Sequence, residues 1–256
     1  MFGEEVFVMR CLRVAGAFAS ALLATVLAAG QEPTFPAVLF TATGKYPDQV
    51  SAAYGDFTLA GPKADALKPL PRGIRHVAYD PVGKQLYGIT NHELCRLDLA
   101  KGEGSEIAFP ADLPRLSWPS GIAFDTKRER VVVAGGGAVG SLYSFTPKTG
   151  KWAVIRGMDT IRLAALTYDA TADRLYGLYQ PLGRGKPTVG VFNALGAVVG
   201  AIELPDPAIP LKLDRGPIGR PVQLVVVGGE LAVIAEDRMF ALDLKTEKVR
   251  ETWTRK

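Results

Sequence analysis

His76-Val-Ala-Tyr-Asp80 runs into Gln85-Leu-Tyr-Gly-Ile-Thr90, and this pair of segments recurs along the chain. The other copies, in chain order, are Gly121-Ile-Ala-Phe-Asp125 with Arg130-Val-Val-Val-Ala-Gly135, Ala165-Leu-Thr-Tyr-Asp169 with Arg174-Leu-Tyr-Gly-Leu-Tyr179, and Pro221–Val227 with Glu230–Glu236. Asp80, Asp125 and Asp169 are 45 and 44 residues apart. A fixed period of this size indicates one supersecondary unit that is used repeatedly.

Each repeat divides into four segments of β-type composition. In the first repeat they are Ile74–Tyr79, Gln85–Thr90, Glu93–Leu99 and Ser105–Phe109. The first two are nearly continuous apolar runs, typical of strands buried on both faces, while the other two alternate and carry charge. Asp80-Pro-Val-Gly83 predicts a tight turn, because Asp bonds nearby backbone, Pro presets φ and Gly accepts positive φ. The pattern predicts an all-β fold, a β-propeller of four-stranded blades. A β-sandwich is disfavoured because it requires no fixed period.

The number of blades depends on residues 36–70, which precede the first clear repeat. Ala37–Thr43, Ala52–Leu59 and Ala64–Leu67 predict three strands of a further blade, equivalent to the second, third and fourth strands of a repeat. This favours five blades, the first of them incomplete. The alternative is a four-bladed ring in which residues 31–70 form an N-terminal strap. The last repeat has four strands of its own, so closure by an N-terminal strand is not evident.

Residues 1–30 predict a signal peptide, and residues 31–256 a single propeller domain. Ala15–Gly30 is an uncharged, Ala-rich run preceded by Arg10 and Arg13, and Ala28-Ala-Gly30 offers a small-residue cleavage pattern. Met9 is an alternative start, and a retained membrane anchor is the alternative to cleavage. We expect an exported protein, periplasmic or secreted, with no transmembrane segment in the mature chain. One cysteine, Cys95, follows residue 30, so no internal disulfide is expected.

The cassette aromatic-Asp-x-x-x-x-x-Leu-Tyr-Gly, followed by Leu94-Cys-Arg-Leu-Asp-Leu99, resembles the YVTN, NHL and gluconolactonase-like superfamily of propellers. The resemblance covers residues 74–253. It implies the architecture and leaves function open, since similar folds host lactonases, lectins, redox-cofactor enzymes and scaffolds. The lactonase branch would hold a divalent metal through Glu, Asn and Asp. Asn91 and Asn193 are the only asparagines, which counts against that branch.

Arginines recur in the loops that join one repeat to the next and in those between the second and third strands. The two kinds of loop share one face of a propeller, so these side chains are expected around the mouth of the central channel. The candidate ligand-binding residues are Arg72, Arg75, Arg115, Trp118, Arg162, Arg184 and Arg220. A ring of arginines suits an anionic small molecule, a glycan or an acidic protein surface. The alternative is that they pair with acidic residues in the same loops.

The candidate catalytic residues are His76 and His92, the only histidines. Either could act as a general base near a carboxylate, although a structural role suits both. No spacing of His or Cys suggests a metal site, and no metal or cofactor is predicted. The mild net charge of +4 does not suggest a nucleic-acid binder. The sequence therefore favours a binding module over an enzyme. The alternatives are a hydrolase or lactonase of the gluconolactonase-like type, with or without a metal, and a protein-interaction scaffold.

Overall fold

The structure is a computed structural model that describes residues 33–42, 50–63, 67–71, 73–98, 101, 103–113, 116, 119–135, 140–158, 161–179, 186–204, 222–235 and 238–254. The chain divides into two units, Met1–Gln31 and Glu32–Lys256, and every described residue belongs to the second. The predicted signal peptide, residues 1–30, therefore lies outside the described residues. No helix in the described part has the length and hydropathy of a membrane span.

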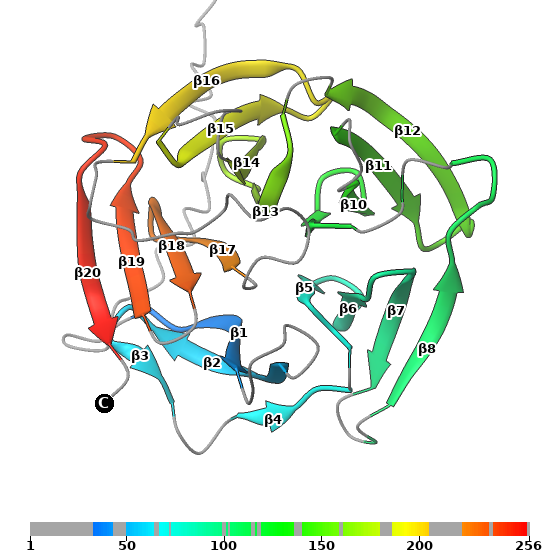
Figure 1. Cartoon of the computed structure of the whole chain (residues 1–256), viewed down its shortest axis with the longest axis horizontal. Coiled ribbons are helices and arrows are strands. Elements are labelled where there is room, and N and C mark those ends of the chain that lie inside the picture. The colour runs from blue at the N-terminus through cyan, green and yellow to red at the C-terminus, as the bar shows by residue number, and fades with distance from the viewer. Residues whose placement is uncertain are drawn as a thin grey trace, which may run out of the picture. The chain divides into compact units, whose positions relative to one another are not determined.

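Five antiparallel sheets surround a common centre as the blades of a propeller (Figure 1). Blades 2 to 5 each have four strands in simple sequence order. Blade 2 consists of β5 His76–Asp80, β6 Gln85–Ile89, β7 Glu93–Asp98 and β8 Glu103–Ala108. Blade 3 consists of β9 Gly121–Asp125, β10 Arg130–Gly135, β11 Gly140–Thr146 and β12 Lys151–Met158. Blade 4 consists of β13 Leu163–Asp169, β14 Arg174–Tyr179, β15 Thr188–Asn193 and β16 Val198–Glu203. Blade 5 consists of β17 Val222–Val227, β18 Glu230–Ala235, β19 Arg238–Asp243 and β20 Val249–Thr254.

Blade 1 is built differently. Its strands are β1 Phe35–Ala42, β2 Val50–Thr58, β3 Gly61–Pro62 and β4 Lys68–Pro69, and β3 and β4 both pair with β2. Since β2 pairs antiparallel with both β1 and β4, β4 runs parallel to β1. It leads into blade 2, as the outermost strands of blades 2, 3 and 4 lead into the blades that follow them. β1, β2 and the interrupted row of β3 and β4 thus occupy the second, third and fourth strand positions.

The prediction of five blades with an incomplete first blade is confirmed, and the four-bladed ring with a strap is wrong. Residues 35–69 form a sheet of their own because their apolar side chains pack against both neighbouring blades. The expected strand at Ala64–Leu67 is not placed correctly. β3 and β4 lie on either side of it, and residues 64–66 lie outside the described part.

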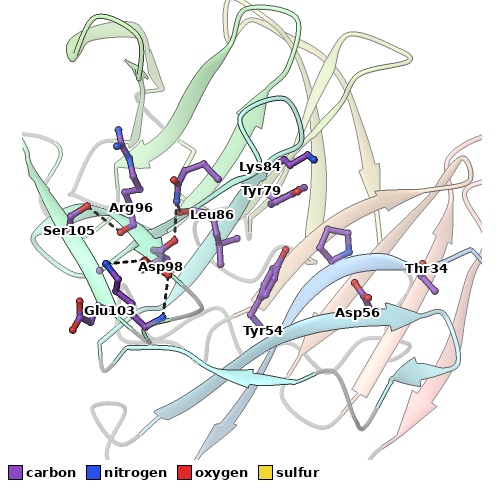
Figure 2. A pocket seen from close by; sticks show the side chains of 15 residues that line it. Thr34, Tyr54, Asp56, Tyr79, Lys84, Leu86, Arg96, Asp98, Glu103 and Ser105 are labelled. Atoms are coloured by element: carbon purple, nitrogen blue, oxygen red, sulfur yellow. Dashed lines mark hydrogen bonds and ion pairs between the residues drawn. The ribbon is translucent and has the colours of Figure 1, made fainter.

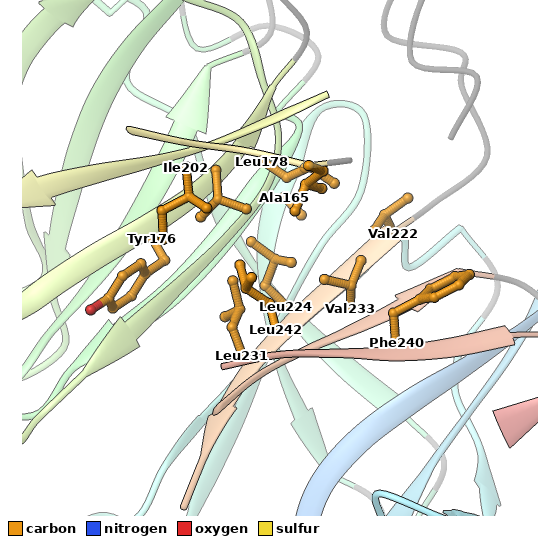
Figure 3. Close-up of a cluster of buried hydrophobic side chains, with 12 residues drawn as sticks. Ala165, Tyr176, Leu178, Ile202, Val222, Leu224, Leu231, Val233, Phe240 and Leu242 are labelled. Carbon is orange, nitrogen blue, oxygen red and sulfur yellow. The ribbon is translucent and has the colours of Figure 1, made fainter. Parts of the chain in front are cut away.

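The core lies between adjacent blades. Figure 3 shows the cluster between blades 4 and 5, where Leu178 and Ile202 meet Leu224 and Val233. Each blade buries both faces, which explains the nearly continuous apolar runs in the inner strands. Between blades 2 and 3, Trp152 meets Phe109 edge-on at 5.4 Å between ring centroids and Phe145 at 5.1 Å.

The turn aspartates act as predicted. Asp80 Oδ1 accepts hydrogen bonds from the backbone N–H groups of Val82 and Gly83 at 2.9 and 3.0 Å. Asp169 does the same for Thr171 and Ala172 at 2.8 and 3.2 Å. The carboxylates are therefore used to close turns between the first and second strands.

The inner edge of β1 faces the centre of the ring without a paired strand among the described residues. Val38 N–H points to this edge and donates to Gln223 Oε1 of β17 at 2.6 Å. N–H groups of alternate residues face the same edge of a strand. The preceding position on this edge is therefore Pro36, which has no N–H group. The bond from Val38 to Gln223 and the missing donor at Pro36 therefore make this edge less available for pairing with a further strand.

Candidate functional site

The predicted arginine-bearing site falls largely outside the described residues, where Arg72, Arg115, Trp118, Arg184 and Arg220 lie. Two of its members are described. Arg75 is half-buried and Arg162 is exposed, and each interacts with another part of the protein. The convergence of the whole set on one mouth stays a prediction.

His76 lies at the start of β5 and is 7% exposed. Its ring is hydrogen-bonded to the backbone of Val222, the first residue of β17. Burial, and then the positive charge of Arg75, lower the pKa of His76 to about 4. The imidazole is therefore neutral at pH 7. Because Val222 belongs to blade 5, this bond joins blades 2 and 5 where blade 1 lacks an innermost strand, which supports a structural role for His76.

The other reactive side chains also have simple surroundings. His92 is exposed in the loop between β6 and β7. Cys95 is buried, and burial followed by the charges of Glu93 and Glu106 raises the pKa of its thiol to about 11. The thiol is thus protonated and a poor nucleophile at neutral pH. Among the described residues, no three His, Cys, Asp or Glu side chains gather in the way a metal ion would require.

A groove of about 900 Å³ opens between blades 1 and 2, and we call it the blade 1–2 groove (Figure 2). It lies at the face that carries the turns between first and second strands and between third and fourth strands. This is the face opposite to the predicted arginine set. The lining residues are Thr34, Pro36, Tyr54, Asp56, Tyr79, Lys84, Gln85, Leu86, Arg96, Leu97, Asp98, Lys101, Glu103, Gly104 and Ser105.

The corresponding place between blades 3 and 4 is closed by polar contacts. Tyr168, which precedes the turn aspartate of blade 4, donates from its hydroxyl to Asp173 Oδ1 at 2.7 Å. Arg128 of blade 3 reaches the same carboxylate with two hydrogen bonds of 2.8 and 3.0 Å. Arg128 also bonds Asp125, which is 1% exposed and is bound by Arg130 Nε at 3.0 Å. The first turn of blade 3 thus covers Tyr168 of blade 4.

Tyr79 occupies the position of Tyr168 in blade 2 but has no such cover. Blade 1 lacks an innermost strand among the described residues, and so it lacks the turn that supplies Asp125 and Arg128 in blade 3. Tyr79 is 37% exposed, more than any other aromatic side chain in the described part. The groove thus lies at the junction where the preceding blade has no innermost strand among the described residues.

Two tyrosines form the inner part of the groove. Figure 2 shows Tyr54, from β2, directed towards Tyr79, from β5. Burial, and then the proximity of Tyr79 and Asp56, raise the pKa of Tyr54, so its phenol stays protonated and can both donate and accept. Leu86 and Leu97 are buried beneath them and give the groove an apolar floor.

Several polar groups of the lining have no bonding partner among the described residues. Gln85 Nε2 donates to the carbonyls of Leu86 and Leu97 at 3.1 and 2.9 Å, which leaves its amide oxygen without a protein donor there. The charged groups of Asp56 and Lys84 make no ion pair within the described part, whereas Asp98 binds Lys101 at 3.7 Å. A polar solute in the groove would therefore meet ready donors and acceptors.

Sequence reasoning did not find this groove. Its residues belong to strands and turns whose sequence pattern is structural, and no motif marks them. The available signal was indirect. The first blade was expected to lack its first strand, and with it the turn that would lie against Tyr79 of the next blade.

No known protein family matches the chain, and no curated protein is similar to it. Solved structures do resemble it. TolB from Acinetobacter baumannii is similar with a TM-score of 0.54 over 86% of this chain and 52% of the TolB chain, at 13% identity. A chain of the nidogen/laminin complex is similar with a TM-score of 0.49 over 86% of this chain and 93% of that one, at 15% identity. The chain spans about half the length of TolB, and this likeness supports the propeller fold alone.

Proposed function

We propose that the protein is an exported β-propeller that serves as a binding module, and that its ligand is a neutral, hydroxyl-rich molecule, a saccharide, held in the blade 1–2 groove. The observation that carries the proposal is the contrast between two junctions. Between blades 3 and 4, Tyr168, Asp173, Arg128 and Asp125 are joined by hydrogen bonds, whereas between blades 1 and 2 Tyr79, Lys84 and Asp56 line an open groove.

The charge of the groove favours a neutral ligand. Its lining has three cationic side chains, Lys84, Arg96 and Lys101, and three anionic ones, Asp56, Asp98 and Glu103. A charged ligand would face as many like charges as opposite ones in the groove. It would lose its hydration without a compensating gain in electrostatic energy. A sugar hydroxyl both donates and accepts, so it can bond a carboxylate on one side and an ammonium or phenol on the other.

The size and shape of the groove suit the same ligand. A volume of about 900 Å³ falls in the range of small-molecule sites, which combine aromatic walls with a few polar groups. Tyr54 and Tyr79 present amphipathic faces against which the apolar face of a sugar ring can pack.

The proposal is tested by isothermal titration calorimetry with neutral oligosaccharides, namely cellotetraose, maltotetraose and chitotetraose, and with tetragalacturonate and a heparin tetrasaccharide as anionic probes. We expect one neutral probe to bind, Tyr79→Ala to abolish binding and Tyr79→Phe to retain most of it. Leu195→Ala is the matched control, because Leu195 is 71% exposed on blade 4, away from the groove. Absence of binding by all three neutral probes, or binding that Tyr79→Ala leaves intact, would refute the groove as a saccharide site.

The arginine-bearing face is a second candidate site, for an anionic small molecule or an acidic protein surface. Two of its predicted members are described: Arg162 is exposed, and Arg75 is half-buried next to His76, whose pKa is lowered first by burial and then by the positive charge of Arg75. Binding of tetragalacturonate or heparin that persists in Tyr79→Ala would support this site, and Arg75→Gln should weaken it.

We also infer that residues 1–30 direct export and that the chain is related to the YVTN, NHL and gluconolactonase-like propellers. The apolar run Ala15–Gly30 supports export. The mass of the protein recovered from a bacterial periplasm tests whether residues 1–30 act as a cleaved export signal. Cleavage would remove the apolar run and lower the mass, and an intact mass would contradict cleavage.

A further inference from the structure

We infer that the ligand is a chain rather than a single unit, and that it crosses blade 2 to occupy a second subsite between blades 2 and 3. This inference rests on the proposed function, because it extends the same binding surface. Its evidence is a second hollow on the other side of blade 2, which shares two residues with the blade 1–2 groove.

The second hollow has a volume of about 310 Å³, and we call it the blade 2–3 hollow. Its lining includes Val82 and Gly83 from the first turn of blade 2, Phe124 and Glu129 from blade 3, and Lys148 from the outer turn of blade 3. The hollow lies at the same face as the groove, because it too is bordered by turns between first and second strands and between third and fourth strands.

Gln85 and Arg96 line both spaces and so form the partition between them. The side chain of Gln85 is held in place, because its amide nitrogen is bonded to two backbone carbonyls. Arg96 is exposed and its charge lies near Tyr87. The amide oxygen of Gln85 therefore offers a fixed acceptor, and the guanidinium of Arg96 offers donors, to whatever passes over the partition.

The blade 2–3 hollow repeats the chemistry of the groove. Val82 is 68% exposed and gives an apolar contact, and the ring of Phe124, stacked on Tyr87 at 6.2 Å between centroids, lies at the base. Glu129 and Lys148 form an ion pair beside it, so the hollow is again balanced in charge. A polymer whose units are alike would find matching surroundings on both sides of blade 2.

Two adjoining subsites predict that affinity depends on ligand length. Once one end of a chain is held in the groove, the other end meets the hollow at high effective concentration, so each added unit strengthens binding until both spaces are filled. A disaccharide held by Tyr54 and Tyr79 should bind without any contribution from the hollow.

The experiment measures the affinity of wild-type protein for cello-, malto- and chito-oligosaccharides from the disaccharide to the octasaccharide. For the series that binds, we expect a gain of about tenfold or more between the disaccharide and the longer members. The double variant Val82→Ala, Lys148→Ala should lose this gain and keep the affinity for the disaccharide. Val154→Ala, Lys151→Ala, at exposed positions of β12, is the matched control and should keep both.

The outcomes separate the two proposals. Equal affinity for short and long members, or a gain that survives in Val82→Ala, Lys148→Ala, overturns the second subsite while Tyr79-dependent disaccharide binding still supports the groove. Failure of every neutral oligosaccharide to bind overturns the proposed function, and this inference with it.

Discussion

Replacing His76 by glutamine should remove a loss of stability that the wild-type protein suffers in weak acid. His76 is 7% exposed and its ring is bonded to the backbone of Val222. Glutamine keeps an N–H group that can make this bond and does not titrate. The pKa of His76 is about 4 in the folded protein, against an ordinary value of 6.5. The folded state therefore prefers the neutral ring, and protonation favours unfolding.

The magnitude follows from this difference. A group whose pKa is lower in the folded state stabilises the protein fully above its unfolded pKa, and the stabilisation is lost as the pH falls. For His76 the loss begins near pH 6.5, reaches about 2 kcal/mol at pH 5 and approaches about 3 kcal/mol at pH 4. Carboxylates titrate in the same range, but they do so equally in the wild-type protein and the variant.

The assay is urea denaturation at constant ionic strength at pH 7.5, 6 and 5, for wild-type protein, His76→Gln and His92→Gln. The quantity of interest is the free energy of unfolding of the variant minus that of the wild type. For His76→Gln it should rise by about 2 kcal/mol between pH 7.5 and 5. For His92→Gln, at an exposed loop position, it should stay constant. A difference for His76→Gln that does not change with pH would refute the buried, neutral histidine.

Three further predictions concern backbone and thiol. Glu247 has a φ of 56°, so Glu247→Gly should raise the free energy of unfolding by about 0.5 to 1 kcal/mol in urea denaturation, and a loss would contradict this account of the turn. At Gly121, an added Cβ would lie 2.9 Å from the backbone nitrogen of Leu166 in the next blade. Gly121→Ala should therefore lower the melting temperature measured by calorimetry, and an unchanged value would show that the inner strands can separate. Cys95 should react with Ellman's reagent at pH 8 only after unfolding, since burial raises the pKa of its thiol to about 11; rapid reaction of the native protein would refute this.

The repeat pattern was sufficient to predict the blades because the signals in it are local. An apolar run after an aromatic-Asp pair forms an inner strand, and Asp80 closes its turn through bonds to residues two and three positions on. The absence of a first strand in blade 1 was also visible, since residues 36–70 contain three β-type segments and not four. The interruption of the outer strand between β3 and β4 was missed. Pro62 and Pro69 end these two short strands, and neither short strand has a hydrophobic pattern of its own.

The groove could not be predicted from its own residues. Tyr79 and Tyr168 stand in the same position of the same cassette, and their sequences before the turn aspartate are alike. Tyr168 is covered by Arg128 of the preceding blade, whereas the blade preceding Tyr79 has no corresponding turn among the described residues. The difference lies in the neighbour, which the local pattern does not record.

The chain's period and turn chemistry thus specify a ring of five blades, with the first blade short of one strand, because each blade is stabilised by contacts between residues close in sequence. Which side chains remain available for a ligand depends on contacts between blades. The bond of Val38 to Gln223 joins residues 185 positions apart, and the exposure of Tyr79 depends on how blade 1 closes against blade 2. Such long-range contacts follow from closure of the ring. Only the folded structure shows that the tyrosine before the turn aspartate, present in blades 2 and 4, borders a groove in blade 2 and is covered by the preceding blade in blade 4.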